Sequence, residues 1–133
     1  MIITNKERYR YYTYMIKGIG IDIVEIDRLN QSIKKQARLP ERILTKNELE
    51  RYTSFTKEQR KVEFLAGRFA AKEAAAKATG RGIGALSFQH IEVTSNERGA
   101  PQLLIEGYEK EFIHVTISHS KHYAVAQVII EES

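Results

Sequence analysis

The sequence of 133 residues contains no cysteine, which excludes disulfide bonds, thiolate metal sites and a cysteine nucleophile. It also lacks an apolar run of the roughly 18–20 residues that a membrane-spanning helix needs. The N-terminus has no continuous apolar segment of the kind found in secretory signals. Internal repeats, low-complexity segments and linkers are absent as well. These absences favour one cytoplasmic globular domain, in line with 42% hydrophobic and 29% charged residues.

The formal net charge of +4 at pH 7 favours acidic partners, such as nucleic acid, an acidic protein or a polyphosphate ligand. Residues 1–14 carry part of this charge and four of the seven tyrosines. We interpret residues 1–14 as an N-terminal extension, derived from an expression vector or from an upstream start codon, and residues 15–133 as the domain. Tyrosines interleaved with basic residues leave open a nucleic-acid stacking arm.

Hydrophobic periodicity predicts a strand, then helices, then four more strands. This order is typical of an α+β domain in which helices pack against an antiparallel sheet. The predicted elements are a strand at 16–26, helices at 27–38, 45–52 and 56–79, and strands at 90–94, 102–106, 112–118 and 123–130.

Capping signals place the helix ends. Thr45 and Glu48 form a capping box at the start of the second helix, and Thr56 and Gln59 repeat the device before the long helix. Gly80 is placed to end the long helix in a left-handed conformation. A glycine-rich loop, "GRGIG", follows.

The first strand contains an ionisable side chain among apolar ones. Ile19, Ile21 and Ile23 alternate with Asp22 and its neighbours, which predicts a strand with both faces partly buried. Asp22 in such a strand needs a partner or a metal ion. The glycines of "KGIGID" weaken the strand, or let another backbone or a ligand come close.

The long helix carries two charged edges. Glu73 and Lys77 lie one turn apart, as do Arg68 and Lys72, and the two pairs are about 140° apart around the helix axis. The simplest interpretation is a surface helix with intrahelical ion pairs.

Three further features favour a catalytic role. The "GRGIG" loop offers backbone N–H groups to phosphate, although phosphate more often binds at a helix N-terminus. Asp22 adds a second carboxylate to Glu73, and two carboxylates with a diphosphate are a common way of holding Mg²⁺. The turn "TISHSKHY" presents Ser118, His119 and Ser120 as possible donors to phosphate oxygens.

Other site chemistries are disfavoured. His114, His119 and His122 lie in one hairpin, but their spacing is not that of a zinc-binding helical pair and no cysteine assists them. A Ser–His–Asp hydrolase lacks its nucleophile-elbow motif.

These features together resemble the holo-(acyl carrier protein) synthase family, the small bacterial type of 4′-phosphopantetheinyl transferase. The resemblance runs from Met15 to about Glu131. It rests on "GIGIDIVEIDR" (18–28), "FLAGRFAAKEAAAKATGRGIG" (64–84) and "VTISHSKHYAVAQVII" (115–130). The family's "F-x-x-K-E-A" core is present as "FAAKEA" (69–74), and "ERILTKNELERY" (41–52) is similar to its second helical segment.

The resemblance implies that the phosphopantetheine arm of coenzyme A moves to a serine of apo acyl carrier protein, with release of adenosine 3′,5′-bisphosphate. It also implies a requirement for Mg²⁺, a role in fatty acid biosynthesis, and a homotrimer with sites shared between subunits. The metal ligands fall on Asp22 and Glu73, and Lys77 matches the position that contacts the coenzyme A phosphates. The positions around the nucleotide are matched by Arg68, Lys72, Gly80, Ser118, His119 and Ser120.

A basic surface is expected to receive the acidic carrier protein. Its candidate residues lie on the predicted helix 27–38 and are Arg28, Lys34, Lys35 and Arg38. A solvated helix face beside the apolar stripe of Leu29 is the simpler alternative. The resemblance favours docking, because the family uses this surface for its carrier.

The chemistry agrees with the resemblance. Attack on a diphosphate needs charge neutralisation and positioning more than a covalent nucleophile. Lys77 would stabilise the leaving phosphate. The base that deprotonates the carrier serine is left open among Glu73, Asp22 and a metal-bound water, with Glu73 favoured. We expect the Glu73/Lys77 edge to face metal and diphosphate, and the Arg68/Lys72 edge to face the nucleotide or a subunit interface.

Two other functions compete with transfer. A non-enzymatic, basic nucleic-acid-binding module would explain the charge but would leave Asp22 and Glu73 without a purpose. A degenerate family member that binds coenzyme A without transfer is opposed by the presence of both carboxylates.

Overall fold

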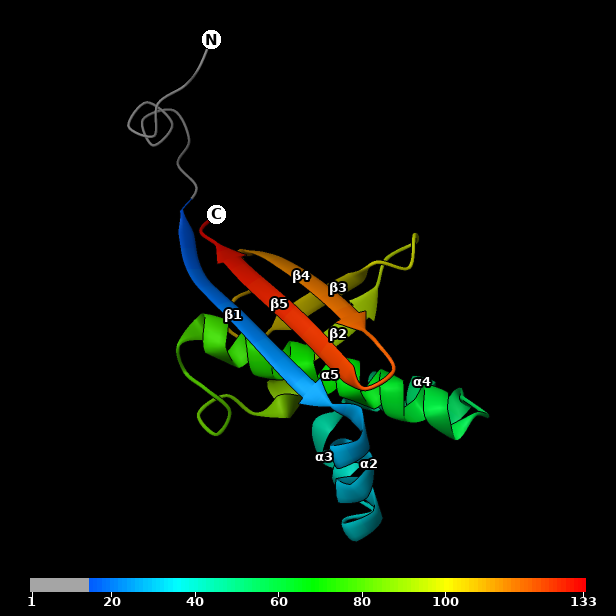
Figure 1. Ribbon diagram of the computed structural model, residues 1–133. Helices are drawn as coiled ribbons and strands as arrows, with labels where there is room; N and C mark the ends of the chain where they lie inside the picture. Colours follow the sequence, from blue (N-terminus) through cyan, green and yellow to red (C-terminus); the bar gives the residue numbers. More distant parts are fainter. Residues whose placement is uncertain (1–14) are drawn as a thin grey trace.

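The computed structural model describes residues 15–133, so the predictions for residues 1–14 lie outside the described residues. The elements follow one another as β1 (Ile16–Glu25), α2 (Ile26–Lys35), α3 (Leu39–Ile43), α4 (Lys46–Ser54), α5 (Glu58–Thr79), the 3₁₀ turn η1 (Phe88–His90), β2 (Ile91–Ser95), β3 (Pro101–Ile105), β4 (Phe112–His119) and β5 (Tyr123–Glu131). Figure 1 shows α5 lying across one face of the β1, β5 and β4 strands, with α2 and α3 beyond the end of β1. This arrangement confirms the predicted α+β class.

Two antiparallel sheets form the β layer. One has the strand order β1-β5-β4, and the other is the β2–β3 hairpin that the sequence predicts around "SNERGAP". The β4–β5 hairpin turns at the predicted "HSKH" segment. Within residues 15–133, no helix is both long enough and apolar enough to cross a membrane.

Helix α5 packs unusually close to β1. A Cβ atom added at Gly18 would lie 1.8 Å from the carbonyl oxygen of Ala78, and one at Gly20 would lie 1.9 Å from that of Ala74. Only glycine fits at these two positions, because the helix backbone occupies the space that a side chain would need. The prediction that the glycines admit another backbone is therefore confirmed.

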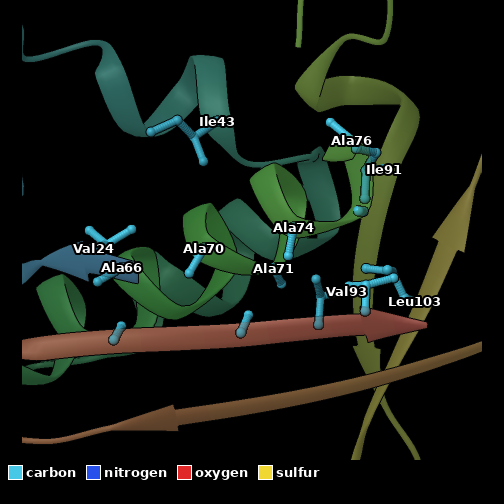
Figure 2. Packing of buried hydrophobic residues seen from close by; sticks show 14 of the residues in the cluster. Val24, Ile43, Ala66, Ala70, Ala71, Ala74, Ala76, Ile91, Val93 and Leu103 are labelled. Atoms are coloured by element: carbon cyan, nitrogen blue, oxygen red, sulfur yellow. The ribbon is translucent and has the colours of Figure 1, made fainter. Parts of the chain in front are cut away.

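The alanines of α5 form the centre of the core. Ala66, Ala70, Ala71 and Ala74 are all fully buried. Figure 2 shows these short side chains on a helix that has Ile43 of α3 on one side and a strand of the sheet on the other. Because alanine adds so little bulk, α5 can contact the sheet and the shorter helices at once.

Several helix ends differ from the prediction. The capping box of Thr45 and Glu48 is present, and Gly80 ends α5 with φ 75°. The expected cap of Thr56 and Gln59 is wrong, because α5 begins at Glu58 with Lys57 as its N-cap and no side-chain cap bond. Helix α2 ends at Lys35 instead of residue 38, because Gln36 has a non-helical backbone and a proline follows at the start of α3.

The outer face of the three-stranded sheet carries exposed isoleucines. Ile19, Ile21 and Ile23 of β1 are 55%, 58% and 64% exposed. The prediction that both faces of this strand are partly buried is therefore wrong for the single chain. Asp22 has the opposite orientation and lies on the face that carries α5.

Candidate active site

Asp22 and Lys77 meet where β1 lies against the C-terminal half of α5. The Lys77 ammonium donates to Asp22 Oδ1 at 3.0 Å and to the carbonyl oxygen of Ile21 at 3.0 Å. The Asp22 side chain is 18% exposed and the Lys77 side chain 54% exposed. The pair is therefore open to a ligand on the side of Lys77.

Glu73 completes this cluster. Burial raises the pKa of the Glu73 carboxyl, the negative charge of Asp22 raises it further, and Lys77 opposes the rise. Lys77 reaches across to β1 and bonds Asp22, so the simple intrahelical ion pair does not describe this helix edge. The structure thus brings together the three residues that the sequence singled out as catalytic, and we call them the carboxylate cluster.

The donor set of the carboxylate cluster suits Mg²⁺. Two carboxylates with an unfavourable mutual charge gain from a divalent cation between them, and Mg²⁺ characteristically takes one or two carboxylates and fills its shell with water and phosphate oxygens. No group of three or more acidic or histidine ligands occurs among residues 15–133.

A second, basic pocket of about 290 Å³ lies beside the N-terminal half of α5. We call it the basic pocket, and its lining residues are Arg51, Phe55, Arg60, Glu63, Phe64, Gly67, Arg68, Ile117 and His119. Burial and the neighbouring Arg51 lower the pKa of Arg68 to about 10. The Nε atom of Arg68 is buried and has no hydrogen-bond partner within residues 15–133. Such a pocket suits an anion.

Sequence reasoning missed Arg51 and Arg60. The spacing of Arg60, Phe64 and Arg68 along α5, four residues each, is the signal that places Arg60 on the Arg68 face. Arg51 comes from α4, and its guanidinium lies 5.5 Å from the centre of the Phe64 ring. Nothing in the local sequence pattern joins α4 to this face, because the contact depends on tertiary packing.

Lys72 does not belong to the coenzyme A set, so its assignment to that set is corrected. Its side chain is fully buried, and its ammonium donates to the Ile43 carbonyl at 2.7 Å, to Glu48 Oε1 at 2.6 Å and to the Phe88 carbonyl at 3.1 Å. Burial lowers the pKa of Lys72, and Glu48 opposes this. An ammonium has three donors, and all three are used inside the protein.

The "SHS" turn divides between the faces of the sheet. His119 lines the basic pocket, on the same side of β4 as Ile117. Ser118 therefore has the opposite orientation, towards the outer face. The Ser120 backbone N–H donates to the Tyr123 carbonyl at 2.8 Å and its hydroxyl accepts from the Tyr123 N–H at 3.3 Å, which closes the β4–β5 turn. Of these three residues, only His119 lines the basic pocket together with Arg68.

Gly80 ends the helix that holds the carboxylate cluster. Its N–H donates to the Lys77 carbonyl, and a Cβ atom added at Gly80 would meet nothing within 4 Å. The residue is exposed, so its position leaves room for a ligand beside Lys77.

The predicted docking surface is present in part. Arg28, Lys34 and Lys35 are exposed on α2, whereas Arg38 lies beyond its end and pairs with Glu41 at 3.3 Å. Arg28 also borders a pocket of about 410 Å³, which is lined by Ile23, Val24, Glu25, Arg28, Leu29, Ser32, Phe69 and Tyr123. This pocket is largely apolar, and its charged lining residues are Arg28 and Glu25.

The carboxylate cluster and the basic pocket lie on different sides of α5. Glu73 and Lys77 are directed towards β1, while Arg68 lies beside α4 and β4. Arg68 and the Glu73/Lys77 pair are thus differently directed, while Lys72 faces the core, and what each edge binds stays a prediction.

Comparison with known proteins shows which family this chain is similar to. A family model described as the 4′-phosphopantetheinyl transferase superfamily matches residues 18–128. A holo-(acyl-carrier-protein) synthase of Staphylococcus aureus is 52% identical over 120 residues, which cover 90% of this chain and 98% of the relative.

Solved structures of such synthases share the fold. The one from Bacillus anthracis, in complex with coenzyme A (3′,5′-ADP), has 49% identity and a TM-score of 0.82, with 90% of this chain and 99% of that chain covered. The one from Neisseria meningitidis has 36% identity and a TM-score of 0.79, with 89% and 100% covered.

Proposed function

The chain belongs to the 4′-phosphopantetheinyl transferase superfamily, and we propose that it moves the phosphopantetheine arm of coenzyme A to a serine of apo acyl carrier protein. The observation that carries the proposal is the meeting of Asp22, Glu73 and Lys77 on the open side of the β1–α5 contact. The similar chain from Bacillus anthracis in complex with coenzyme A supports the choice of donor.

The carboxylate cluster supplies the chemistry. Asp22 and Glu73 would hold Mg²⁺, which when bound neutralises the charge of the diphosphate. Glu73 accepts the proton of the carrier serine, and the serine oxygen forms a bond to the phosphorus that carries the pantetheine arm. The bond from that phosphorus to the bridging oxygen breaks, and adenosine 3′,5′-bisphosphate leaves. Lys77 stabilises the charge that develops on the leaving phosphate.

The raised pKa of Glu73 suits this role. A base whose pKa lies above the ordinary carboxyl value holds a proton more firmly once it has accepted it. Asp22, bonded to Lys77, is the better fixed anion of the two. We therefore assign proton transfer to Glu73 and a positioning charge to Asp22.

We further propose a homotrimer in which each site is completed by a neighbouring chain. The exposed row of Ile19, Ile21 and Ile23 is a surface that a monomer seldom leaves in water. The basic pocket, which lies on a different side of α5 from the carboxylate cluster, would then hold the nucleotide end of a coenzyme A bound at a neighbour's cluster. Arg68 and His119 contribute to it.

Complementation tests the shared site. Glu73→Gln removes the carboxylate cluster and Arg68→Ala removes the basic pocket, so each variant alone is expected to be nearly inactive. Mixing the two after subunit exchange should restore part of the activity, because some sites then receive both intact halves. Mixtures that stay as inactive as their components would show that one chain supplies both halves.

Carrier docking is assigned to α2. The exposed Arg28, Lys34 and Lys35 would meet the acidic carrier protein, and the neighbouring apolar pocket would receive one of its side chains. We propose that this reaction serves fatty acid biosynthesis in the cytoplasm.

The release of adenosine 3′,5′-bisphosphate tests the reaction. Purified protein is mixed with coenzyme A, Mg²⁺ and apo carrier protein, and the nucleotide products are separated by chromatography. Release is expected with the carrier, and not with a carrier whose acceptor serine is replaced by alanine. Equal release with both carriers would mean hydrolysis instead of transfer and would contradict the proposal.

A further inference from the structure

The buried Lys72–Glu48 ion pair joins four parts of the chain. Lys72 of α5 contacts Glu48 of α4 at 2.6 Å, and the two side chains are 0% and 2% exposed. Lys72 also bonds the carbonyl of Ile43 at the end of α3 and that of Phe88 in η1. The pair thus fixes α3, α4 and η1 to the central helix.

Glu48 uses both of its carboxylate oxygens. Oε1 accepts the backbone N–H of Thr45 at 2.8 Å, and Oε2 accepts that of Val93 in β2 at 2.7 Å. Every polar group of the pair therefore has partners. A buried ion pair adds little net stability over apolar residues of equal volume, but its directional bonds permit one arrangement of the elements.

The position of the pair connects it to the basic pocket. Glu48 lies one turn before Arg51 on α4, and Lys72 lies one turn after Arg68 on α5. The Arg51 and Arg68 guanidinium groups lie 5.5 Å and 4.2 Å from the centre of the same Phe64 ring. Each arginine thus lies one helical turn from one member of the ion pair.

The two arginines repel each other across the α4–α5 contact. Their mutual charge is one of the causes that lower the pKa of Arg68. Two neighbouring cations favour separation of the helices that carry them. Some attractive contact between α4 and α5 must oppose this, and the Lys72–Glu48 pair lies next to the arginines.

We propose that the Lys72–Glu48 ion pair is a positioning device for the basic pocket, holding α4 against α5 so that Arg51 and Arg68 stay together for an incoming phosphate group. The inference rests on the proposed function, because the phosphate belongs to the nucleotide part of coenzyme A. Lys72 and Glu48 themselves do not touch the ligand. They act through the arginines.

The carboxylate cluster is held independently. Glu73 and Lys77 stand on α5 where the glycines of β1 let helix and strand come together, and Lys77 bonds Asp22 of β1. Loss of the ion pair should therefore weaken nucleotide binding and leave the chemical step largely intact. A role limited to general stability would give no such division.

The test replaces the pair by apolar residues in Lys72→Met/Glu48→Leu, which leaves no unpaired buried charge. Lys46→Met/Glu50→Leu, at two exposed positions of α4, is the matched control, because it also removes one positive and one negative charge. The dissociation constant of adenosine 3′,5′-bisphosphate is measured by titration calorimetry. The kcat and the KM for coenzyme A are measured beside it, and circular dichroism and thermal unfolding check the fold.

For the folded double variant, we expect the dissociation constant and the KM to rise about tenfold, as for the loss of one charge-assisted contact. The kcat should stay within about twofold of the original protein, because transition-state contacts are kept. The control should bind as the original protein does. An unchanged dissociation constant, or a loss confined to kcat, would overturn the proposal.

A second variant keeps the test decisive if the double variant does not fold. Arg51→Ala removes a pocket residue without touching the core pair, and it should also raise the dissociation constant about tenfold. Unchanged binding by Arg51→Ala would leave the ion pair nothing to position and would refute the inference. Failure of the unaltered protein to bind the bisphosphate would instead count against the proposed function.

Discussion

The contact between β1 and α5 gives the most quantitative prediction. In Gly20→Ala, the new methyl group would lie 1.9 Å from the carbonyl oxygen of Ala74 and 2.8 Å from the backbone nitrogen of Ala78. An ordinary contact begins near 3.4 Å, so strand and helix must separate by the difference, about 1.5 Å. Both partners are backbone atoms, and no side-chain rotation relieves the overlap.

This separation affects stability and catalysis together. Overpacking of this kind destabilises a fold by about 1–3 kcal/mol. Asp22 follows Gly20 by two residues on the same face, so it moves away from Glu73 and Lys77. A misplacement of about 1 Å in a catalytic constellation costs roughly 100-fold in rate.

The assay compares Gly20→Ala with Gly18→Ala. Gly18→Ala creates a similar clash, with the new methyl group 1.8 Å from the carbonyl oxygen of Ala78, but it lies four residues from Asp22. Chemical denaturation should show a loss of stability for both variants, and the transfer rate should fall further for Gly20→Ala. A Gly20→Ala protein with unchanged stability and rate would refute the close-packing account of this site.

Three other perturbations bear on the site. Burial and Asp22 raise the pKa of Glu73, while Lys77 lowers it. Lys77→Met should therefore move the acidic limb of the pH profile of kcat/KM to higher pH. An unmoved limb would show that Glu73 is not the group that titrates there. A carboxyl whose pKa is higher in the folded than in the unfolded protein stabilises the fold at pH values below its unfolded pKa. This stabilisation is lost as the pH rises through the folded pKa. Glu73→Gln should therefore raise the melting temperature at pH 8 and not at pH 3. A rise at pH 3 and none at pH 8 would contradict the burial of this carboxyl. Charge reversal at Arg28 and Lys35 should raise the KM for carrier protein roughly tenfold and flatten its salt dependence, with kcat nearly unchanged. An equal effect at high salt would argue against electrostatic docking.

Local signals in the sequence predicted the framework well. The capping box at Thr45, the left-handed end at Gly80 and the alternation in the strands depend on neighbouring residues alone, so they can be seen without coordinates. Asp22 stood out because an ionisable group in an apolar strand requires a partner, and the structure supplies Lys77.

Tertiary packing decided what the sequence did not reveal. On a helical projection Lys72 lies on a charged edge beside Arg68, yet it is buried, because α3, α4 and η1 together provide three acceptors for its ammonium. Arg51 joins the basic pocket for the same reason, since α4 packs across α5. The exposed Ile19 is the opposite case, because its periodicity indicates burial that a single chain does not provide.

The mass of the carrier protein tests the central claim most directly. Apo carrier protein is incubated with coenzyme A, Mg²⁺ and either the unaltered protein or Glu73→Gln, and its intact mass is then measured. A gain of one phosphopantetheine arm with the unaltered protein, and none with Glu73→Gln, is the predicted result. Equal gains with both proteins would contradict the role of Glu73, and no gain with any divalent cation would contradict the proposed transfer itself.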